Sequence, residues 1–228
     1  MLSLFYLTDV AAYRYPWYFP NAAILGILVF AHVVQDGVDF AQRLKNKRAA
    51  LSRALTNLVR AVAALGLSIT LLTAAASAYQ FRVQQRELEE GGRKQIGLWL
   101  RRNAASRADS VFLEPLGYIG FFSQLKMLDY PGLCAPEVVA VEKRLHSARQ
   151  ADIIAELRPD WLVLRPVEIP EIEQTIPLTQ LYSPARTFDA SERLKAYRWL
   201  PGRPYLEFDQ TFVVFKRNKD GAAAQSRN

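Results

Sequence analysis

The chain has very few cysteine and histidine residues, which disulfide-linked and metal-binding proteins need. Its 228 residues include one cysteine, Cys134, and two histidines, His32 and His146. A single cysteine excludes an internal disulfide framework. We expect Cys134 to be a small buried side chain, because no partner cysteine or cation cluster is near it in the sequence. Two histidines are too few for a histidine-based zinc site, so we predict no metal.

The sequence also lacks the short motifs that mark several large enzyme classes. It has no P-loop, no GxSxG elbow, no HExxH and no CxxC pair. Phosphoryl, acyl and zinc-dependent chemistry therefore lack their usual carriers. We assign no catalytic residue from motifs and expect no resident cofactor.

Charge is absent from the nineteen residues 61–79, AVAALGLSITLLTAAASAY. As a helix this run is about 28 Å long, close to the thickness of the hydrocarbon core of a bilayer. A second apolar run, WYFPNAAILGILVFAHVV at 17–34, follows an aromatic cluster suited to the headgroup level. We therefore predict that residues 1–87 form a two-helix transmembrane hairpin, with spans at 17–35 and 60–80.

The formal net charge of +7 comes largely from the loop between these two runs. No acidic residue interrupts its basic residues, which are Arg43, Lys45, Lys47, Arg48, Arg53 and Arg60. The positive-inside rule predicts that this loop, 41–59, is cytoplasmic and that both flanking ends are outside. Because so much of the excess charge belongs to one loop, we expect no nucleic-acid partner.

The residues before the first span favour a membrane surface. The start, MLSLFYLTD, has no basic region ahead of its apolar residues, so a cleavable signal peptide fits poorly. Arg14, beside Tyr15 and Trp17, is expected at the outer headgroup level. There it would hold a lipid phosphate or act as a simple anchor, and the residues favour neither reading. Membrane lipid is therefore an expected partner.

After the second span the pattern becomes that of a small α/β domain, residues 88–218. Helix formers continue from Arg82, and Gly91 and Gly92 are expected to loosen the helix before a second helical stretch at 96–103. Expected strands are 110–114, 126–130, 160–165, one near 178–188 and one near 210–216; expected helices are 136–146 and 149–157, with a short helix or loop at 190–197. This alternation favours a small mixed sheet layered with helices, followed by a disordered tail at 219–228.

A glycine-punctuated segment after the first strand is one candidate binding element. Gly117, Tyr118 and Gly120 belong to it, and such a loop can bring backbone N–H groups close to an anion. The pattern is not GxGxxG. A tight strand-to-helix turn is the favoured interpretation.

Three charged residues at strand ends are further candidates. Glu114 and Asp129 each end a short strand, where open α/β sheets tend to bind ligands, but a cap or turn role is favoured for both. Arg165 follows a third strand, and for it a carboxylate partner inside the domain is favoured over a substrate anion.

Several segments occur together in an order that resembles a known family. They are YPWYFP, IGLWL, EPLGYIG, LDYPGL before PE, RPDWLVLR and FVVFKR, spread over residues 13–217. This series is similar to the segment that follows the last membrane span in bacterial GT-C type membrane glycosyltransferases, the mannosyltransferase-like group. The resemblance implies sugar transfer from a polyprenyl-phosphate donor at the outer face of a bacterial inner membrane.

The chain departs from that family at the catalytic part. Those enzymes typically use an acidic residue in the first outward loop of a bundle of many spans, whereas this sequence predicts two spans. Asp9 is the only acidic residue before the first span, and nothing around it supports catalysis. The resemblance therefore transfers no catalytic residue, and whether the chain is an enzyme stays open.

Three hypotheses follow. The leading one is the C-terminal portion of such a transferase, inactive alone and working with a multi-span membrane subunit and a polyprenyl-phosphate sugar. The alternative is a non-enzymatic, membrane-anchored periplasmic module that binds a ligand or another envelope protein. A third is a complete small enzyme with Glu114 and Asp129 as acid and base, which requires carboxyl groups within about 5 to 10 Å of each other.

Overall fold

The computed structural model describes residues 19–44, 48–200 and 203–218. The chain separates into two compact units, a helical hairpin within residues 1–77 and an α/β domain within residues 78–228. This division falls ten residues before the boundary at 87/88 expected from the sequence. Arg14 and the expected tail at 219–228 lie outside the described residues.

The hairpin consists of α3 (Phe19–Leu44) and α4 (Ala49–Gln84), the second of which continues into the α/β domain. The expected loop at 41–59 is wrong in extent, because helix occupies most of it. The region is rich in Ala, Leu and Arg, which are strong helix formers. The two helices contact each other where Gly66 faces the Phe30 ring. Ser52 Oγ also donates a 2.7 Å hydrogen bond to the Ala41 carbonyl.

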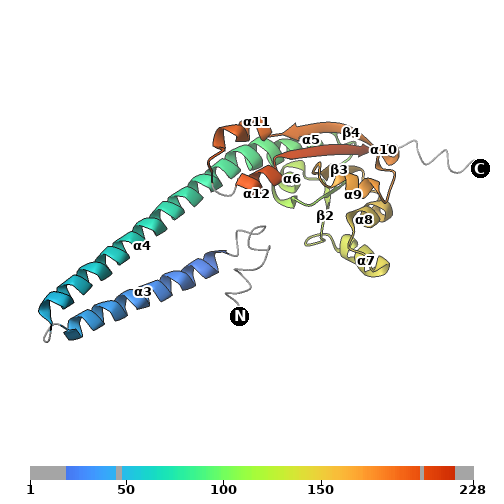
Figure 1. Cartoon of the computed structure of the whole chain (residues 1–228). Helices are drawn as coiled ribbons and strands as arrows, with labels where there is room; N and C mark the ends of the chain where they lie inside the picture. The colour runs from blue at the N-terminus through green and yellow to red at the C-terminus, as the bar shows by residue number, and fades with distance from the viewer. Residues whose placement is uncertain (1–18, 45–47, 201–202, 219–228) are drawn as a thin grey trace, which may run out of the picture. The chain divides into compact units, whose positions relative to one another are not determined.

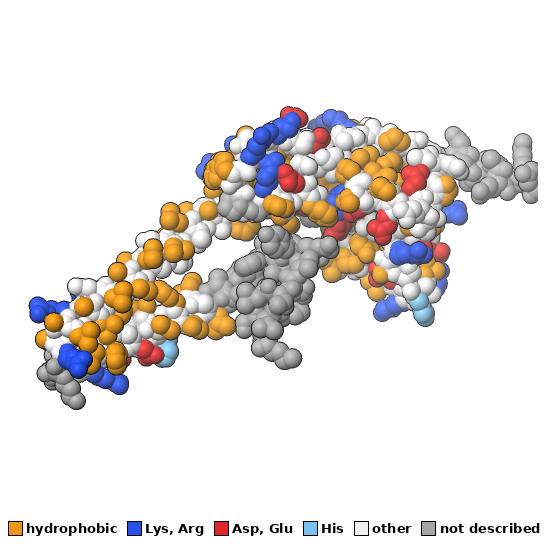
Figure 2. Space-filling model, viewed as in Figure 1, with side chains coloured by type: hydrophobic (Ala, Val, Ile, Leu, Met, Phe, Trp, Pro, Cys, Tyr) orange, Lys and Arg blue, Asp and Glu red, His pale blue; other side chains and the backbone are white. Residues whose placement is uncertain are grey.

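Both hairpin helices are long enough and apolar enough to cross a membrane. In the most apolar 18-residue window of each helix, 6% of the residues in α3 and none in α4 are buried within the chain. Figure 2 shows hydrophobic side chains along the outside of both helices. A helix from the core of a water-soluble protein would be mostly buried, so these two are not core helices.

The helix that begins as α4 changes its backbone hydrogen-bonding pattern without ending. It passes through the π-helix η2 (Gln85–Arg93) into α5 (Lys94–Asn103). Gly91 and Gly92, which were expected to loosen the helix, lie in this wider π-helical segment, and the helix continues through them. The Arg193 guanidinium donates to the carbonyls of Glu87 and Gly91 at 3.2 and 3.3 Å, which helps to satisfy backbone groups in the widened turn.

A mixed five-stranded sheet forms the centre of the domain (Figure 1). Its order is β2 (Lys126–Asp129), β1 (Ser110–Leu113), β3 (Trp161–Leu164), β5 (Thr211–Arg217) and β4 (Tyr182–Asp189). The first three strands are parallel, and β5 is antiparallel to both of its neighbours. The mixed α/β sheet predicted from the sequence is confirmed.

Short helices connect and cover the strands. They are α6 (Leu116–Ser123), α7 (Pro136–Leu145), α8 (Gln150–Leu157), α9 (Ile169–Glu173), α10 (Leu178–Leu181), α11 (Ser191–Leu194), the 3-10 turn η3 (Lys195–Tyr197) and α12 (Arg203–Phe208). The segment that begins at Gly117 is thus helix, not a loop. The strand expected near 178–188 starts only at Tyr182, because α10 takes its first four residues.

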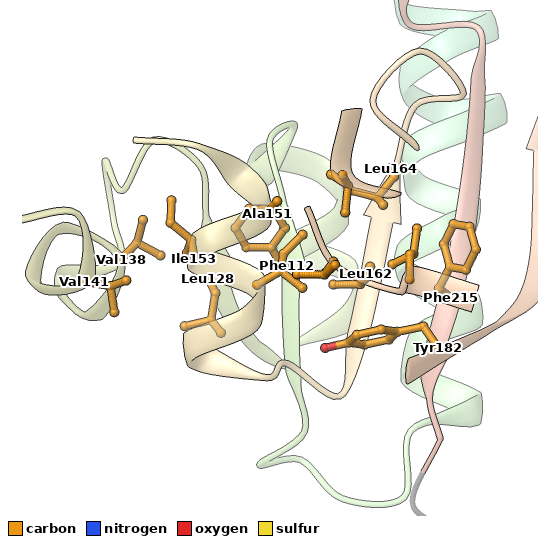
Figure 3. Packing of buried hydrophobic residues seen from close by; sticks show 14 of the residues in the cluster. Phe112, Leu128, Val138, Val141, Ala151, Ile153, Leu162, Leu164, Tyr182 and Phe215 are labelled. Carbon is orange, nitrogen blue, oxygen red and sulfur yellow. The ribbon is translucent and has the colours of Figure 1, made fainter. Parts of the chain in front are cut away.

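Alternating side chains of the central strands bury opposite faces of the sheet. Phe112 and Leu162 point to one face, where they pack with residues of α7 and α8 (Figure 3). Val111 and Trp161 point to the other face and pack with residues of α5 and α6. The period of two expected for strands explains this division. The sheet is therefore the middle layer of three.

A third apolar cluster joins the segment after β4 to the helix that enters the domain. It consists of Val83, Leu88, Ala190, Leu194, Leu200 and Leu206. Val83 and Leu88 come from α4 and η2, whereas the other four residues come from a segment more than 100 residues later. The beginning of the domain is thus fixed to its C-terminal part.

Candidate functional site

The chain runs from β1 outward to the edge strand β2 and then returns past β1 to β3. The connection from β1 to β2 passes through α6, which contributes Ile119 to the cluster on one face. The return from β2 to β3 passes through α7 and α8, which contribute Val138 and Ile153 to the opposite face. The carboxyl ends of β1 and β3 therefore flank a topological switch point, where open α/β sheets bind ligands.

Glu114 and Arg165, both singled out from the sequence, follow β1 and β3 and meet at this switch point. Arg165 Nη1 forms an ion pair with Glu114, and the Arg165 side chain is only 5% exposed. Its Nε donates to Asp209 Oδ1 at 2.7 Å and its Nη1 donates to Glu168 Oε1 at 2.8 Å. Arg165 therefore has three carboxylate partners inside the domain, where the sequence favoured one.

A second arginine completes this network, which we call the switch-point cluster: Glu89, Arg93, Glu114, Arg165, Glu168 and Asp209. Arg93 forms ion pairs with both Glu89 and Asp209, and its side chain is 13% exposed. The Arg165 guanidinium carbon also lies 4.5 Å from the centre of the Phe208 ring. Four members, Glu89, Arg93, Glu168 and Asp209, were not identified from the sequence.

The electrostatics of the cluster exclude a role for Arg165 as a free anion receptor. Burial lowers the pKa of Arg165, but Asp209, Glu168 and Glu114 outweigh that effect and raise its pKa above the ordinary value. Arg165 is therefore a permanent cation that is already surrounded by carboxylates. With four carboxylates and two guanidinium groups, the cluster is net negative. A phosphate would be repelled here rather than bound.

Asp129 has the turn role favoured on sequence grounds. Its carboxylate accepts hydrogen bonds from the backbone N–H groups of Leu133 at 2.7 Å and Cys134 at 3.0 Å, and it is 2% exposed. Gly132 makes the turn possible with a φ of +86°. Because the turn directs residues 133 and 134 outward, Cys134 is exposed, and the expectation of a buried cysteine is wrong.

These contacts weaken the acid and base pair considered for Glu114 and Asp129. The Glu114 carboxylate is paired with Arg165, and the Asp129 carboxylate accepts backbone hydrogen bonds. Neither is placed as a free general base in this structure. Glu114 is the more accessible of the two, with a side chain 40% exposed.

The three candidates of the glycine segment, Gly117, Tyr118 and Gly120, all lie in the helix α6. A Cβ at Gly120 would lie 3.2 Å from atoms of Leu116 and Met127, so the glycine allows close helix packing. Gly117 has open space around it. The Tyr118 hydroxyl accepts a hydrogen bond from Gln85 Nε2. The glycine segment thus belongs to a helix that packs beside η2 and α5.

A cavity of about 340 Å³ lies beside the switch-point cluster and shares Glu168 with it. Tyr130, Arg149, Gln150 and Glu171 contribute further polar groups to its lining. Gln150 Oε1 is buried without a hydrogen-bond partner among the described residues. Burial, and then the charges of nearby glutamates led by Glu142, raise the pKa of Tyr130. This cavity suits a small ligand that donates hydrogen bonds through hydroxyl or amino groups.

No group of metal-ligating side chains is present in the described parts of the chain. A family model described as "Domain of unknown function (DUF8728)" matches residues 77–215, which is more than half of the sequence and nearly the whole α/β domain. No curated protein and no solved structure matches the chain.

Proposed function

The chain belongs to the family described as "Domain of unknown function (DUF8728)", and from this premise we propose that it is the membrane-anchored C-terminal part of a glycosyltransferase-like protein. In this role it acts at the outer face of the bacterial inner membrane with a lipid-linked sugar donor. It is not catalytic on its own. A multi-span membrane subunit supplies the catalytic residues.

The observation that carries the proposal is the exposure of the hairpin. Leu65 and Leu72 of α4 are 62% and 71% exposed, and many neighbouring apolar side chains of both helices are exposed to a similar degree. Leaving this much apolar surface in water is unfavourable, whereas hydrocarbon accepts it without cost. The basic residues 43–60 at the turn of the hairpin then favour the cytoplasmic side.

The switch-point cluster supports the non-catalytic part of the proposal. The place where an α/β domain of this topology would hold a substrate is filled by ion pairs within the chain. The resemblance to the segment after the last span of GT-C type transferases supports the lipid-linked donor. In those enzymes the catalytic acid belongs to the membrane bundle, which agrees with the pairing of Glu114 to Arg165 and of Asp129 to backbone N–H groups in this domain.

Membrane placement can be tested with reporter fusions and extraction. We expect the full chain to stay in the membrane fraction after carbonate washing. A periplasmic reporter should be active after Arg217, and a cytoplasmic reporter should be active at the turn between α3 and α4. A chain that is soluble without detergent, or a reporter after Arg217 that is active only in the cytoplasm, would contradict the proposal.

The sugar-transfer role needs a separate experiment. Purification of the full chain in mild detergent, with mass spectrometry of bound proteins and lipids, should recover a multi-span subunit or a polyprenyl-phosphate sugar. If the chain is inserted in the membrane but neither partner is recovered with it, the membrane anchor stands and the transferase role is contradicted.

The cavity beside Glu168 favours a second candidate function, a non-enzymatic membrane-anchored binding or interaction module. Its unpaired Gln150 Oε1 is a binding group that the fold itself does not use. Native mass spectrometry of the full chain and of Gln150→Leu tests it. A small polar ligand that binds the first and not the second, without any transferase subunit, would favour the module over the leading proposal.

A further inference from the structure

Two aromatic side chains form an exposed pair at the start of the domain. The rings of Tyr79 and Trp199 are stacked, with centroids 5.6 Å apart and an interplanar angle of 14°. Trp199 is 68% exposed and Tyr79 is 41% exposed, and Phe81, two residues further along the same helix, is 59% exposed. Large aromatic surfaces left in the open commonly mark a contact with a partner or a membrane.

The contacts around Trp199 hold this pair in place. Leu194 and Leu200, on either side of it in sequence, are buried against Val83 in the third apolar cluster. The Arg86 guanidinium lies 5.9 Å from the centre of the Tyr197 ring and donates to its hydroxyl. Trp199 is therefore exposed because the fold places it outside, and not because the segment is loose.

The side chains around the pair carry excess positive charge. Arg86 and Arg193 share one carboxylate, Glu87, at 2.8 and 3.0 Å. Arg82 and Arg198 are both exposed, and neither has an ion-pair partner in the part of the chain that the structure describes. Figure 2 shows Lys and Arg side chains over the α11 end of the domain. This surface is thus suited to anionic groups.

The position of Tyr79 along its helix predicts the level in the bilayer at which this surface lies. Tyr79 is the last residue of the uncharged run 61–79, which as helix is about 28 Å long. If that run spans the bilayer, Tyr79 and the stacked Trp199 lie at the boundary between hydrocarbon and headgroups. Tyr and Trp prefer this level. Arg82 follows about 4.5 Å further out, where phosphate groups lie.

We propose that Tyr79, Phe81, Arg82, Arg198 and Trp199 form an interfacial collar that docks the α/β domain on the outer leaflet by binding anionic phospholipid. The aromatic rings enter the upper acyl-chain region and the two arginines contact lipid phosphates. The collar rests on the membrane insertion in the proposed function. Trp199 reaches it from the far C-terminal part of the fold, so the membrane contact is made by tertiary structure as well as by the span.

Fluorescence quenching tests the aromatic part. The full chain is placed in nanodiscs of phosphatidylglycerol and phosphatidylcholine, with or without lipids brominated near the headgroup end of the acyl chain. The difference between the wild type and Trp199→Phe isolates the emission of Trp199 from that of the other three tryptophans. We expect brominated lipid to quench this difference emission, because an interfacial tryptophan lies at the depth of the bromine atoms. Unquenched emission at the wavelength of a water-exposed indole would overturn the collar.

Lipid retention tests the charged part. Native mass spectrometry should show that Arg82→Gln and Arg198→Gln each reduce the preference for phosphatidylglycerol about fivefold, since each basic residue near the surface contributes about 1 kcal/mol. Arg101→Gln removes the same charge from an exposed position on α5 and serves as the matched control. An equal effect of all three substitutions would overturn the assignment of a specific surface.

Carbonate extraction of the same samples separates this inference from the proposed function. If the chain is inserted but Trp199 is unquenched, the collar is wrong and the membrane anchor stands. If the chain is not inserted, the proposed function fails first. Trp199 that is unquenched by lipid but shielded when a membrane protein co-purifies would assign the surface to that protein and overturn the lipid assignment.

Discussion

Apolar side chains point outward in the hairpin and inward in the α/β domain. Leu72 of α4 is 71% exposed, whereas Leu113 of β1 is 0% exposed. The domain is therefore stabilised by burial within the chain. The hairpin has little such burial and depends on what surrounds it. The comparison teaches that the two regions place apolar surface differently, and that only the domain buries it within the chain.

Polar side chains differ between the two regions in the same way. In the hairpin, Ser68 and Thr70 donate to backbone carbonyls four residues earlier, at 2.8 and 2.9 Å. In the domain, Arg165 pairs with Asp209 across 44 residues of sequence. A helix in hydrocarbon must satisfy its polar groups locally, whereas a folded domain can satisfy them through tertiary contacts.

The largest expected effect is in the domain, at Arg165. Arg165→Met removes the shared partner of three carboxylates, including Asp209, which is 5% exposed. Breaking a buried ion pair from one side costs about 3 to 5 kcal/mol. We expect the free energy of unfolding of the domain to fall by this amount. Urea titration of the full chain in detergent, followed by the fluorescence of the buried Trp161, measures it.

Arg144→Met is the matched control for this prediction. Arg144 also pairs with a carboxylate, Glu156, but its side chain is 60% exposed. Exposed ion pairs contribute at most about 1 kcal/mol. Equal losses for the two variants would show that the switch-point cluster is no more than an ordinary surface network.

Most of the elements could be predicted from local signals in the sequence. Pro136 with Glu137 in the first turn marks the start of α7, and the continuous apolar run 161–164 marks the buried strand β3. The helices α9 and α12, with five and six residues, are too short for a periodicity to be read. The helix α10 was missed because the pairing of β4 with β5 starts only at Tyr182.

The candidate site could be predicted only in part, because its partners come from distant segments. Arg165 and Glu114 stand at strand ends, a signal that the sequence carries. Arg93 and Asp209 are 116 residues apart, and nothing local indicates that η2 and the turn between α12 and β5 meet. The same holds for Trp199, which only the fold brings beside Tyr79.

The second effect compares two equally exposed apolar side chains. Leu72 in the hairpin is 71% exposed and Phe121 in the domain is 74% exposed. Leu72→Arg should raise the apparent free energy of membrane insertion by about 2.5 to 3.5 kcal/mol. Phe121→Arg should change domain stability by no more than about 0.5 kcal/mol. An insertion assay and a urea titration on the full chain measure the two. Normal insertion of Leu72→Arg would argue against lipid around α4.

The third effect compares two glycines at close helix contacts. A Cβ at Gly97 would lie 2.8 Å from the backbone oxygen of Ile119, whereas a Cβ at Gly66 would meet only the Phe30 ring. Backbone cannot yield as a ring can. We therefore expect Gly97→Ala to cost the domain about 1 to 3 kcal/mol. Gly66→Ala should be nearly neutral, because Phe30 can turn outward and alanine favours helix. Thermal melts in detergent that show equal losses would mean that the hairpin is packed as tightly as the domain.

The smallest effect is a loss of stability at high pH that is confined to the domain. Burial raises the pKa of Tyr182 to about 12, and its hydroxyl donates to the Pro159 carbonyl at 3.0 Å. The unfolded chain releases this proton near pH 10 and the folded chain near pH 12. The contribution of Tyr182 to stability is therefore complete below pH 10 and is lost progressively as the pH rises through 12. Tyr182→Phe should lower stability at pH 8, because Pro159 loses its donor, but it should flatten the decline above pH 10. A decline of equal slope in Tyr182→Phe would assign the alkaline loss to other groups, and loss of hairpin helicity over the same range would contradict its restriction to the domain.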